Sequence, residues 1–339
     1  MRSGVFSTER FPDNRGIAIV IVLWVVMVLS LLISGFAFTM HVETQVASYA
    51  RKELKAEMLA RSGIEVARMQ LILGALSPTN SGFDALNQDW STNELLYVDH
   101  ELGDGIFNVK VTDEESKIPI NRATDLQLKR LFGLLGADPA DGDVITDSIL
   151  DWIDTDDLTR LNGAESDYYQ SLSPPYRAKN GPLDRVEELL LIRGVTPELY
   201  QGTPATDTDP ARPGLAEVFT TTTTGNINVN TASAIVLQAL GLDEAQVQAV
   251  LSRRDGADGI PGTDDDLPFH SADEFFAAIG NLDPATKQAA QAMVTVTSSF
   301  FTVKSTGEVG GVKRTILATL YRNGANVQTV MWREVREGT

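Results

Sequence analysis

The chain has 339 residues, 43% of them hydrophobic, and a formal net charge of -18. This length is enough for more than one cored domain. The excess of acidic over basic side chains argues against a nucleic-acid partner, because phosphate binding depends on Lys and Arg. With no Cys and only three His, disulfides and thiolate metal sites are excluded and a zinc site is disfavoured. Any bound metal ion would therefore have oxygen ligands.

The N-terminus combines a polar leader, residues 1–16, with an apolar run over residues 17–38. The apolar run contains no ionisable side chain, and at ~1.5 Å per helical residue it spans a hydrocarbon core of ~30 Å. Three arginines outnumber two acidic residues in the leader, which favours a cytoplasmic N-terminus. We expect one transmembrane helix, with the bulk of the chain on the far side of the membrane.

The junction between Gly16 and Ile17 resembles the class III signal of type IV pilin-like proteins. In that family a prepilin peptidase cuts after the glycine, the apolar helix is retained and the new N-terminus is methylated. The resemblance implies the same processing here. A cleaved secretory signal is disfavoured, because its apolar core would be shorter. The remaining alternative is an ordinary signal anchor. Ile21 occupies the fifth mature position, where most pilin-like helices carry Glu.

Helical periodicity continues beyond the apolar run, with apolar residues at helical spacing and charged residues between them. We predict one helix from about residue 17 to about residue 75. The loop-forming cluster at residues 77–82 should end it. Its second half should pack on a globular head, because the apolar stripe needs a partner.

Strand-like alternation appears in two blocks that are far apart in the chain. The expected strands are residues 94–102, 105–113, 300–308, 311–323 and 327–335. Turns are predicted at Asp104-Gly105, Gly310-Gly311 and Asn323-Gly324. The pattern predicts an α+β fold, in which an antiparallel meander packs on the first helix and is interrupted by a large all-α insertion. The predicted domains are residues 39–113, the insertion at 114–297, and the C-terminal strands at 298–339.

The insertion contains an approximate repeat, residues 118–136 and 227–243. Each copy has an Asn, a small helix-starting residue, leucines at helical spacing and an exit glycine. Asn121 and Asn230, with Thr124 and Thr231, suit helix entry, and Gly136 and Gly241 suit helix exit. Such segments look like helix-hairpin-helix or SAM-like units. Asp138 and Asp243 follow the two hairpin glycines and would repel phosphate, so packing or protein contact is favoured over DNA binding.

Two acidic loops are candidate cation sites. In the first, Asp154, Asp156 and Glu165 match positions 1, 3 and 12 of an EF-hand, but Leu158 and Thr159 break that pattern. The second places Asp255, Asp258, Asp264, Asp265 and Asp266 among glycines. Clustered carboxylates repel one another unless a cation neutralises them. The alternative for each loop is a solvated acidic surface.

The segment from residue 151 to residue 200 is similar to the signature region of the type II secretion system minor pseudopilin K family, also called general secretion pathway protein K. The resemblance extends over essentially the whole chain. It implies a non-enzymatic, single-pass inner-membrane protein with its bulk in the periplasm, at the tip of the pseudopilus with minor pseudopilins I and J. It also implies calcium binding in the helical domain. The candidate metal ligands are Asp151, Asp154, Asp156, Asp157, Glu165, Asp167, Asp255, Asp258, Asp264 and Asp266.

Three other functions fit parts of this pattern. A minor pilin or adhesin at the tip of a type IV pilus would share the leader and helix, and a membrane-anchored helix-hairpin-helix protein would share the repeat. Paired carboxylates could also serve a glycosidase-like acid and base. No G-x-S-x-G, H-E-x-x-H or phosphate-loop motif is present, so no catalytic residue is expected.

Overall fold

The computed structural model describes residues 15–80, 82–205, 211–280 and 282–335. The chain divides into two units, residues 1–55 and residues 56–339. Helix α1 (Arg15–Leu76) begins in the first unit and ends in the second, beside the predicted loop cluster. The leader, residues 1–14, lies outside the described residues, as do the side chains of Arg15 and Gly16.

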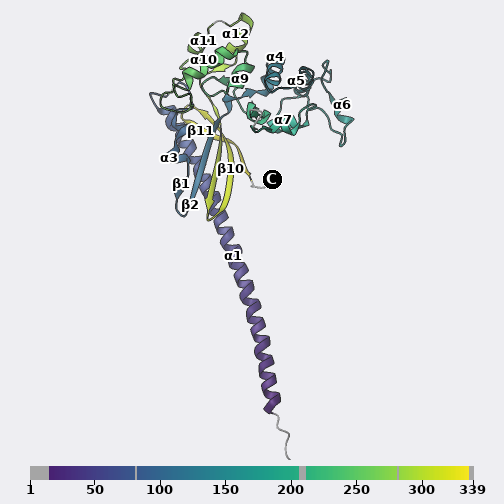
Figure 1. Ribbon diagram of the computed structural model, residues 1–339, viewed down its shortest axis with the longest axis vertical. Helices are drawn as coiled ribbons and strands as arrows, with labels where there is room; N and C mark the ends of the chain where they lie inside the picture. Colours follow the sequence, from purple (N-terminus) through teal and green to yellow (C-terminus); the bar gives the residue numbers. More distant parts are fainter. Residues whose placement is uncertain (1–14, 81, 206–210, 281, 336–339) are drawn as a thin grey trace, which may run out of the picture. The chain divides into compact units, whose positions relative to one another are not determined.

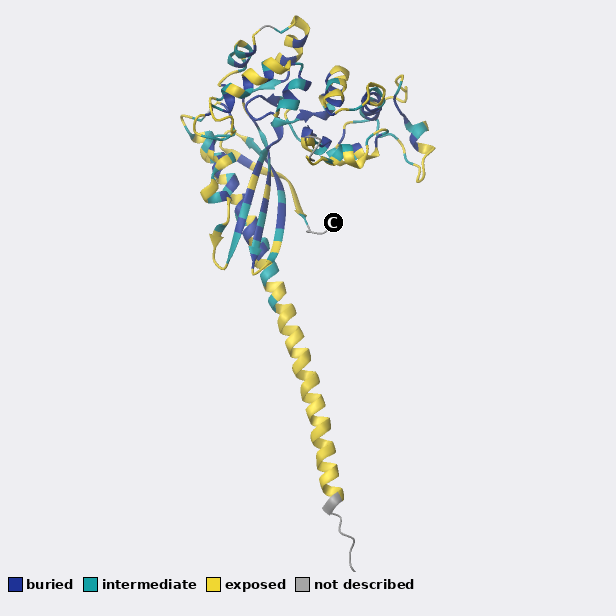
Figure 2. Cartoon of the chain, viewed as in Figure 1, coloured by how far each residue is buried: buried dark blue, intermediate teal, exposed yellow. Residues whose placement is uncertain are grey.

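In the first unit, the large apolar residues from Ile17 to Met40 are exposed (Figure 2). Within the described residues, α1 is the helix long and apolar enough to cross a membrane. The first unit therefore fits a single-pass anchor, as the sequence predicted.

The second unit contains a five-stranded antiparallel sheet in the order β1-β2-β9-β10-β11 (Figure 1). The strands are β1 (His100–Leu102), β2 (Gly105–Asp113), β9 (Phe300–Val309), β10 (Val312–Asn323) and β11 (Asn326–Val335). β2 pairs with β9, so the helical insertion leaves and re-enters the sheet between two neighbouring strands. The predicted α+β fold with an interrupted meander is confirmed.

The first predicted strand, residues 94–102, is largely wrong. Residues Glu94–Tyr97 form the short helix α3, which follows the short helix α2 (Asp89–Thr92). Asn93 caps α3 by accepting a hydrogen bond from the Leu96 amide at 3.2 Å, and Tyr97 is buried. This local capping outweighs the alternating pattern.

Two of the predicted turns are displaced by one residue. Leu102 pairs with Gly105 and Asn323 pairs with Asn326, so the turns are centred on residues 103–104 and 324–325. Gly103 and Gly324 have φ values of 70° and 59°, in the left-handed region that such turns require. The Gly310-Gly311 turn is confirmed, because β9 ends at Val309 and β10 begins at Val312.

One hydrophobic core lies between the sheet and the part of α1 in the second unit. Ala56, Ala60, Ile64, Ala67 and Leu71 are buried at helical spacing against sheet residues. The helix crosses the sheet closely, since a Cβ added at Gly307 would lie 2.1 Å from the Ala56 carbonyl oxygen. A glycine is therefore required at residue 307, where the helix passes closest to this strand.

A second hydrophobic core belongs mainly to the insertion, which contains two similar repeats. The first repeat runs from β3 (Ile118–Pro119) to β6 (Phe219–Thr220), and the second from β7 (Ile227–Asn228) to β8 (Val294–Thr295); in each, the two strands pair in parallel. The first contains α4 (Asp125–Leu134), α5 (Pro139–Ile153), α6 (Ser166–Gln170), α7 (Pro197–Gln201) and α8 (Leu215–Val218). The second contains α9 (Ala234–Ala239), α10 (Glu244–Arg254), α11 (Ala272–Ile279) and α12 (Pro284–Gln291). Smaller elements are the 3-10 helices η1 (Glu114–Ser116), η2 (Ile120–Arg122) and η3 (Val186–Leu191), and the strand pair β4 (Gly202–Thr203) and β5 (Arg212–Pro213).

The glycine exits of the repeats are confirmed. Gly136 and Gly241 have φ values of 80° and 104°. In each repeat the following residue donates its amide to a carbonyl of the last helical turn, Ala137 to Phe132 and Leu242 to Leu237. This is the Schellman pattern that a left-handed glycine makes possible.

The predicted helix entries are half correct. Thr124 caps α4 in a capping box with Gln127. Thr231 does not cap α9, whose N-cap is Ser233. Instead the Thr231 hydroxyl donates to Asp113 Oδ2 at 2.5 Å, because this repeat begins against the end of β2.

The two repeat asparagines act as clamps rather than caps. Asn121 donates to the Leu183 carbonyl and accepts from the Leu183 amide, at 2.9 and 2.8 Å. Asn230 does the same to Phe269, also at 2.9 and 2.8 Å. A proline precedes each clamped residue. The repeat therefore continues past the two-helix hairpin and through the acidic loop that follows it.

Candidate metal centre

The first acidic loop, residues 154–165, folds back onto the end of α5. Asp147 and Asp151 lie one turn apart on that helix. Asp147 Oδ2 accepts hydrogen bonds from the Asn162 amide at 3.0 Å and from its side chain at 3.2 Å. The Arg160 amide donates to both Asp151 oxygens, at 3.3 and 3.2 Å. Two helix carboxylates thus fix the course of the loop.

Gly163 permits this closure. A Cβ at that position would lie 1.9 Å from Asp151 Oδ2. The Gly163 carbonyl is held from the other side by Arg193 Nη1 at 3.0 Å. The loop can therefore pass close to the Asp151 carboxylate only where no side chain is present.

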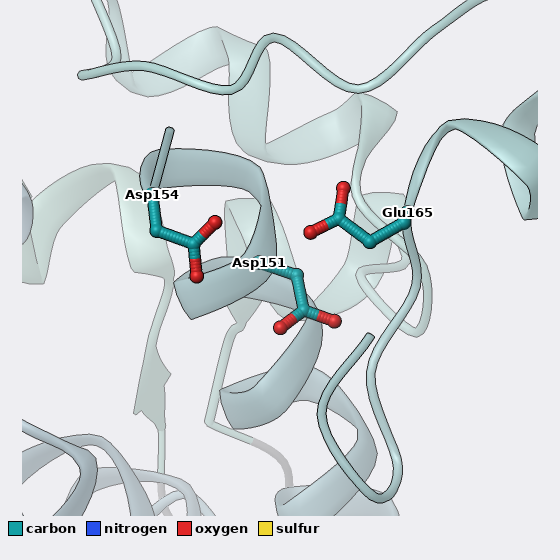
Figure 3. A group of neighbouring side chains, drawn as sticks. All are labelled: Asp151, Asp154 and Glu165. Carbon is teal, nitrogen blue, oxygen red and sulfur yellow. The ribbon is translucent and has the colours of Figure 1, made fainter. Parts of the chain in front are cut away.

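Loop closure brings three carboxylates together: Asp151 from α5, Asp154 at its C-cap and Glu165 at the N-cap of α6. One oxygen from each lies within 4.8 Å of the others. Figure 3 shows Asp154 and Glu165 facing each other from opposite sides, with Asp151 between them on the helix. Asp151 is 0% exposed and Glu165 is 3% exposed.

Several oxygens of this group have no hydrogen-bond partner. Both Glu165 carboxylate oxygens and Asp154 Oδ1 are buried without a donor among the described residues. Leaving a buried charged oxygen unsatisfied costs several kcal/mol. A cation placed among the three carboxylates could bind one oxygen from each of them and supply the positive charge that the group needs.

The electrostatics of the group also favour a cation. Burial is the largest cause of a rise in the pKa of Glu165 to about 7, and the neighbouring charges of Asp151, Asp154, Asp157 and Asp156 contribute to that rise in that order of size. Burial also raises the pKa of Asp151, while the Arg160 amide and guanidinium oppose the rise. The protein therefore holds these carboxylates together against their mutual repulsion.

The remaining predicted ligands of the first loop lie around this group. Asp156 Oδ1 accepts from the Leu158 amide at 2.9 Å, and Asn180 Nδ2 donates to Asp157 Oδ1 at 2.9 Å. The Asn180 Oδ1 atom is buried without a partner among the described residues. Asp167 is exposed on α6 and is not part of the group.

Two residues of this region, Asp147 and Asn180, were not identified from the sequence. The four-residue spacing of Asp147 and Asp151, which places both carboxylates on one face of the helix, was a usable signal for Asp147. Asn180 lies far along the chain, and no local pattern marks it.

The second acidic loop, residues 255–266, is arranged differently. Asp255 is ion-paired with Arg254 at 2.7 Å, and Asp266 Oδ2 accepts from the Gly262 amide at 2.7 Å. Asp258 Oδ1 accepts from the Ile260 amide at 2.8 Å. Asp265 accepts from the Ala257 amide and from Thr263, at 2.7 Å each, and Asp264 is exposed. Within the described residues these carboxylates do not form a group that could share an ion.

The donor set of the first loop suits a hard cation. Calcium takes six to eight oxygen ligands at about 2.3–2.6 Å, so oxygens on opposite sides of the ion lie roughly 5 Å apart. The carboxylate oxygens of Asp151, Asp154 and Glu165 meet that spacing. Histidine and cysteine are not part of the group, which disfavours zinc.

Comparisons with known proteins agree with one another. Models of the family described as type II secretion system (T2SS), protein K match residues 105–203 and 227–297, together half of the chain. Type II secretion system protein K of Pseudomonas aeruginosa is 25% identical over 341 residues, covering 96% of this chain and 94% of that protein. The match to type II secretion system protein K of Klebsiella pneumoniae is 28% identical over 201 residues, or 56% of this chain, and spans only 60% of that relative.

A solved structure has the same fold. A chain of the GspK-GspI-GspJ complex from enterotoxigenic Escherichia coli superimposes with a TM-score of 0.67 at 20% identity, covering 86% of this chain and 99% of that one. The interrupted sheet, the repeated helical insertion and the family-model matches lead to one assignment. The chain belongs to the type II secretion system protein K family.

Proposed function

We propose that this protein is a non-enzymatic minor pseudopilin that caps the tip of a type II secretion pseudopilus, together with pseudopilins resembling I and J. The observation that carries the proposal is the pilin-like unit of α1 and the five-stranded sheet, into which a helical insertion is placed between β2 and β9. The solved relative was captured in a GspK-GspI-GspJ complex, which supports partners of that kind.

Ile21 supports a place at the tip. It is an exposed apolar residue of α1 at the position where a shaft subunit would need a carboxylate to neutralise the terminal amine of the subunit above. A charge left alone in the membrane costs several kcal/mol, so a subunit without that carboxylate is poorly suited to have another above it. The large insertion acts in the same direction, because its bulk would be hard to repeat along a packed fibre.

Processing and location follow from the same assignment. A prepilin peptidase would cut between Gly16 and Ile17, the new amine of Ile17 would be methylated, and the apolar part of α1 would anchor the protein in the inner membrane. The second unit would then lie in the periplasm. Intact-mass measurement of the membrane form tests this, and a chain beginning near Phe38 would contradict it.

We propose further that the first acidic loop binds calcium through Asp151, Asp154 and Glu165. The support is the set of buried carboxylate oxygens that lack a donor. When bound, the ion would neutralise the group and stabilise the folded state by its preference for that state. Thermal unfolding of the full chain with a chelator, calcium or magnesium is the test. Calcium should raise the melting temperature and magnesium should do so poorly, whereas equal curves would contradict the site.

Site-specific cross-linking in assembled pseudopili tests the tip position. A photoreactive residue at Met58 or at Met69, both exposed on α1, should give contacts with the I-like and J-like subunits at one end of the fibre. Substitution of Ile21 with Glu would supply the missing carboxylate, and Ile21→Leu is its matched control. Regular self-contacts along the shaft in the unsubstituted protein would rule out a capping role.

A further inference from the structure

Arg160 is placed at the edge of the three-carboxylate group. Its Nε atom lies 3.3 Å from Asp151 Oδ1, and its Nη2 atom lies 3.5 Å from Asp154 Oδ2. In the described part of the chain, no other Lys or Arg is recorded in an ion pair with these carboxylates. The guanidinium therefore supplies one positive charge to the carboxylate group from one side.

The guanidinium satisfies this need only in part. Its ion pairs involve Asp151 and Asp154, while both Glu165 oxygens and Asp154 Oδ1 have no partner in the described part of the chain. One positive charge faces three carboxylates. A divalent ion inserted among them could bind one oxygen from each carboxylate, including Glu165, with which Arg160 forms no ion pair among the described residues.

A bound divalent ion and the guanidinium would repel each other, because both are cations beside the same oxygens. The Arg160 side chain is 45% exposed, so it can move into water. Its backbone amide remains hydrogen-bonded to Asp151, so the loop need not open when the side chain leaves.

We propose that Arg160 is an internal counter-cation that competes with the metal ion. In the metal-free protein its guanidinium neutralises Asp151 and Asp154, and ion binding drives the guanidinium out to solvent. This inference rests on the proposed calcium site and adds a residue that sets its affinity. Arg160 thus lowers the affinity for the ion and stabilises the metal-free fold.

Arg254, in the second repeat, is a counter-cation that is fixed in place. Arg254 is buried, pairs with Asp255 through Nε, and donates from Nη1 to the carbonyls of Val229 and Ala232 at 3.2 and 2.6 Å. These carbonyl contacts anchor its guanidinium. The Arg160 guanidinium has no such anchors among the recorded contacts of the described residues, which suits exchange with an ion.

The test is calcium titration calorimetry on the full chain in detergent micelles, comparing the unsubstituted protein with Arg160→Gln and Arg177→Gln. Arg177 is exposed on the same repeat and forms no ion pair with another described residue. Its substitution removes one positive charge, as Arg160→Gln does, and is therefore the matched control. Arg160→Gln should lower the calcium Kd about tenfold or more, since removal of an adjacent like charge favours the ion. Arg177→Gln should change it less than about twofold, because an exposed charge outside the carboxylate group is screened by salt.

Thermal unfolding gives the second readout. Without calcium, Arg160→Gln should melt at a lower temperature than both other proteins, and calcium should remove that difference. An unchanged or raised Kd for Arg160→Gln, in a protein that does bind calcium, would overturn the role of Arg160 and leave the site intact. If neither the unsubstituted protein nor Arg160→Gln binds calcium, the site itself fails and the competition fails with it. Binding by Arg160→Gln alone would support the competition.

Discussion

The two acidic loops occupy the same place in the two repeats, but their carboxylates differ in the hydrogen-bond and ion-pair partners that they contact. Each loop follows the second helix of a hairpin, α5 or α10, and leads to a proline and an asparagine-clamped residue. In the first loop, buried oxygens of Asp154 and Glu165 lack donors among the described residues. In the second loop, backbone amides and Thr263 donate hydrogen bonds to the carboxylates, and Arg254 forms an ion pair with Asp255. The two loops therefore have similar acidic density, but they differ in how many hydrogen-bond donors reach their carboxylates.

The difference can be traced to the ends of the two helices. With the C-caps Asp154 and Asp255 aligned, Ile153 in the first repeat corresponds to Arg254 in the second, and Asp151 corresponds to Ser252. The second repeat thus has a buried guanidinium in place of an apolar residue and no carboxylate one turn earlier. The two repeats share one scaffold, but only in the second is the carboxylate at the end of the helix neutralised by a buried arginine.

The sharpest way to break the comparison is to remove the internal cation of the second repeat. Arg254→Met leaves Asp255 buried without its partner, so the free energy of unfolding should fall by about 3–5 kcal/mol. Denaturant unfolding should show the same loss with and without calcium. A loss below about 1 kcal/mol would mean that the ion pair is dispensable.

The metal-free first loop should give a pH dependence of stability. The folded-state pKa of Glu165 is raised to about 7 from an ordinary value of 4.5, so the folded protein binds the proton more tightly than the unfolded chain. Stability should then fall by up to about 3 kcal/mol as pH rises from about 4.5 to about 7.

The pKa of the buried Asp113 is also raised to about 7, chiefly by burial. The Glu165 contribution is therefore the difference between the unsubstituted protein and Glu165→Gln, measured by denaturant unfolding in chelator at several pH values. Calcium should remove this difference in slope. Parallel pH profiles for the two proteins in chelator would contradict the prediction.

Matched substitutions in the two loops should separate them by calcium affinity. Asp154→Asn with Glu165→Gln should weaken calcium binding about 100-fold or more, which corresponds to about 2.7 kcal/mol. Asp258→Asn with Asp264→Asn makes the same charge change in the second loop and should alter affinity less than about twofold. Calorimetric titration measures both, and equal losses would show that the two loops share the ion.

The asparagine clamps provide the smallest expected effect and test the equivalence of the repeats themselves. Asn230→Ala should cost about 2 kcal/mol and Asn121→Ala about 1 kcal/mol, because both lose two hydrogen bonds but only Asn230 is fully buried. Denaturant unfolding measures the two losses. A larger loss for Asn121→Ala would reverse the order that burial predicts.

Local sequence patterns correctly predicted the helices and strands that are stabilised by short-range spacing of apolar residues. The unbroken apolar run and the helical spacing predicted α1 to within about two residues at each end, and alternation predicted β2, β9, β10 and β11. Alternation failed at residues 94–102, where the Asn93 cap stabilises a helical turn instead. The glycine exits at Gly136 and Gly241 were also readable, since a left-handed conformation at a helix end selects that residue.

The candidate metal centre depends on contacts that no local pattern contains. The sequence marked both loops as acidic candidate ion sites, with an EF-hand-like spacing in the first loop only. Closure of the loop over Gly163 brings Asp151 and Glu165 together, and the partners of the second loop come from Arg254, Thr263 and turning backbone amides. Whether a carboxylate is left needing a cation is decided by the donors that reach it after folding, because hydrogen bonds and ion pairs act only over a few ångströms.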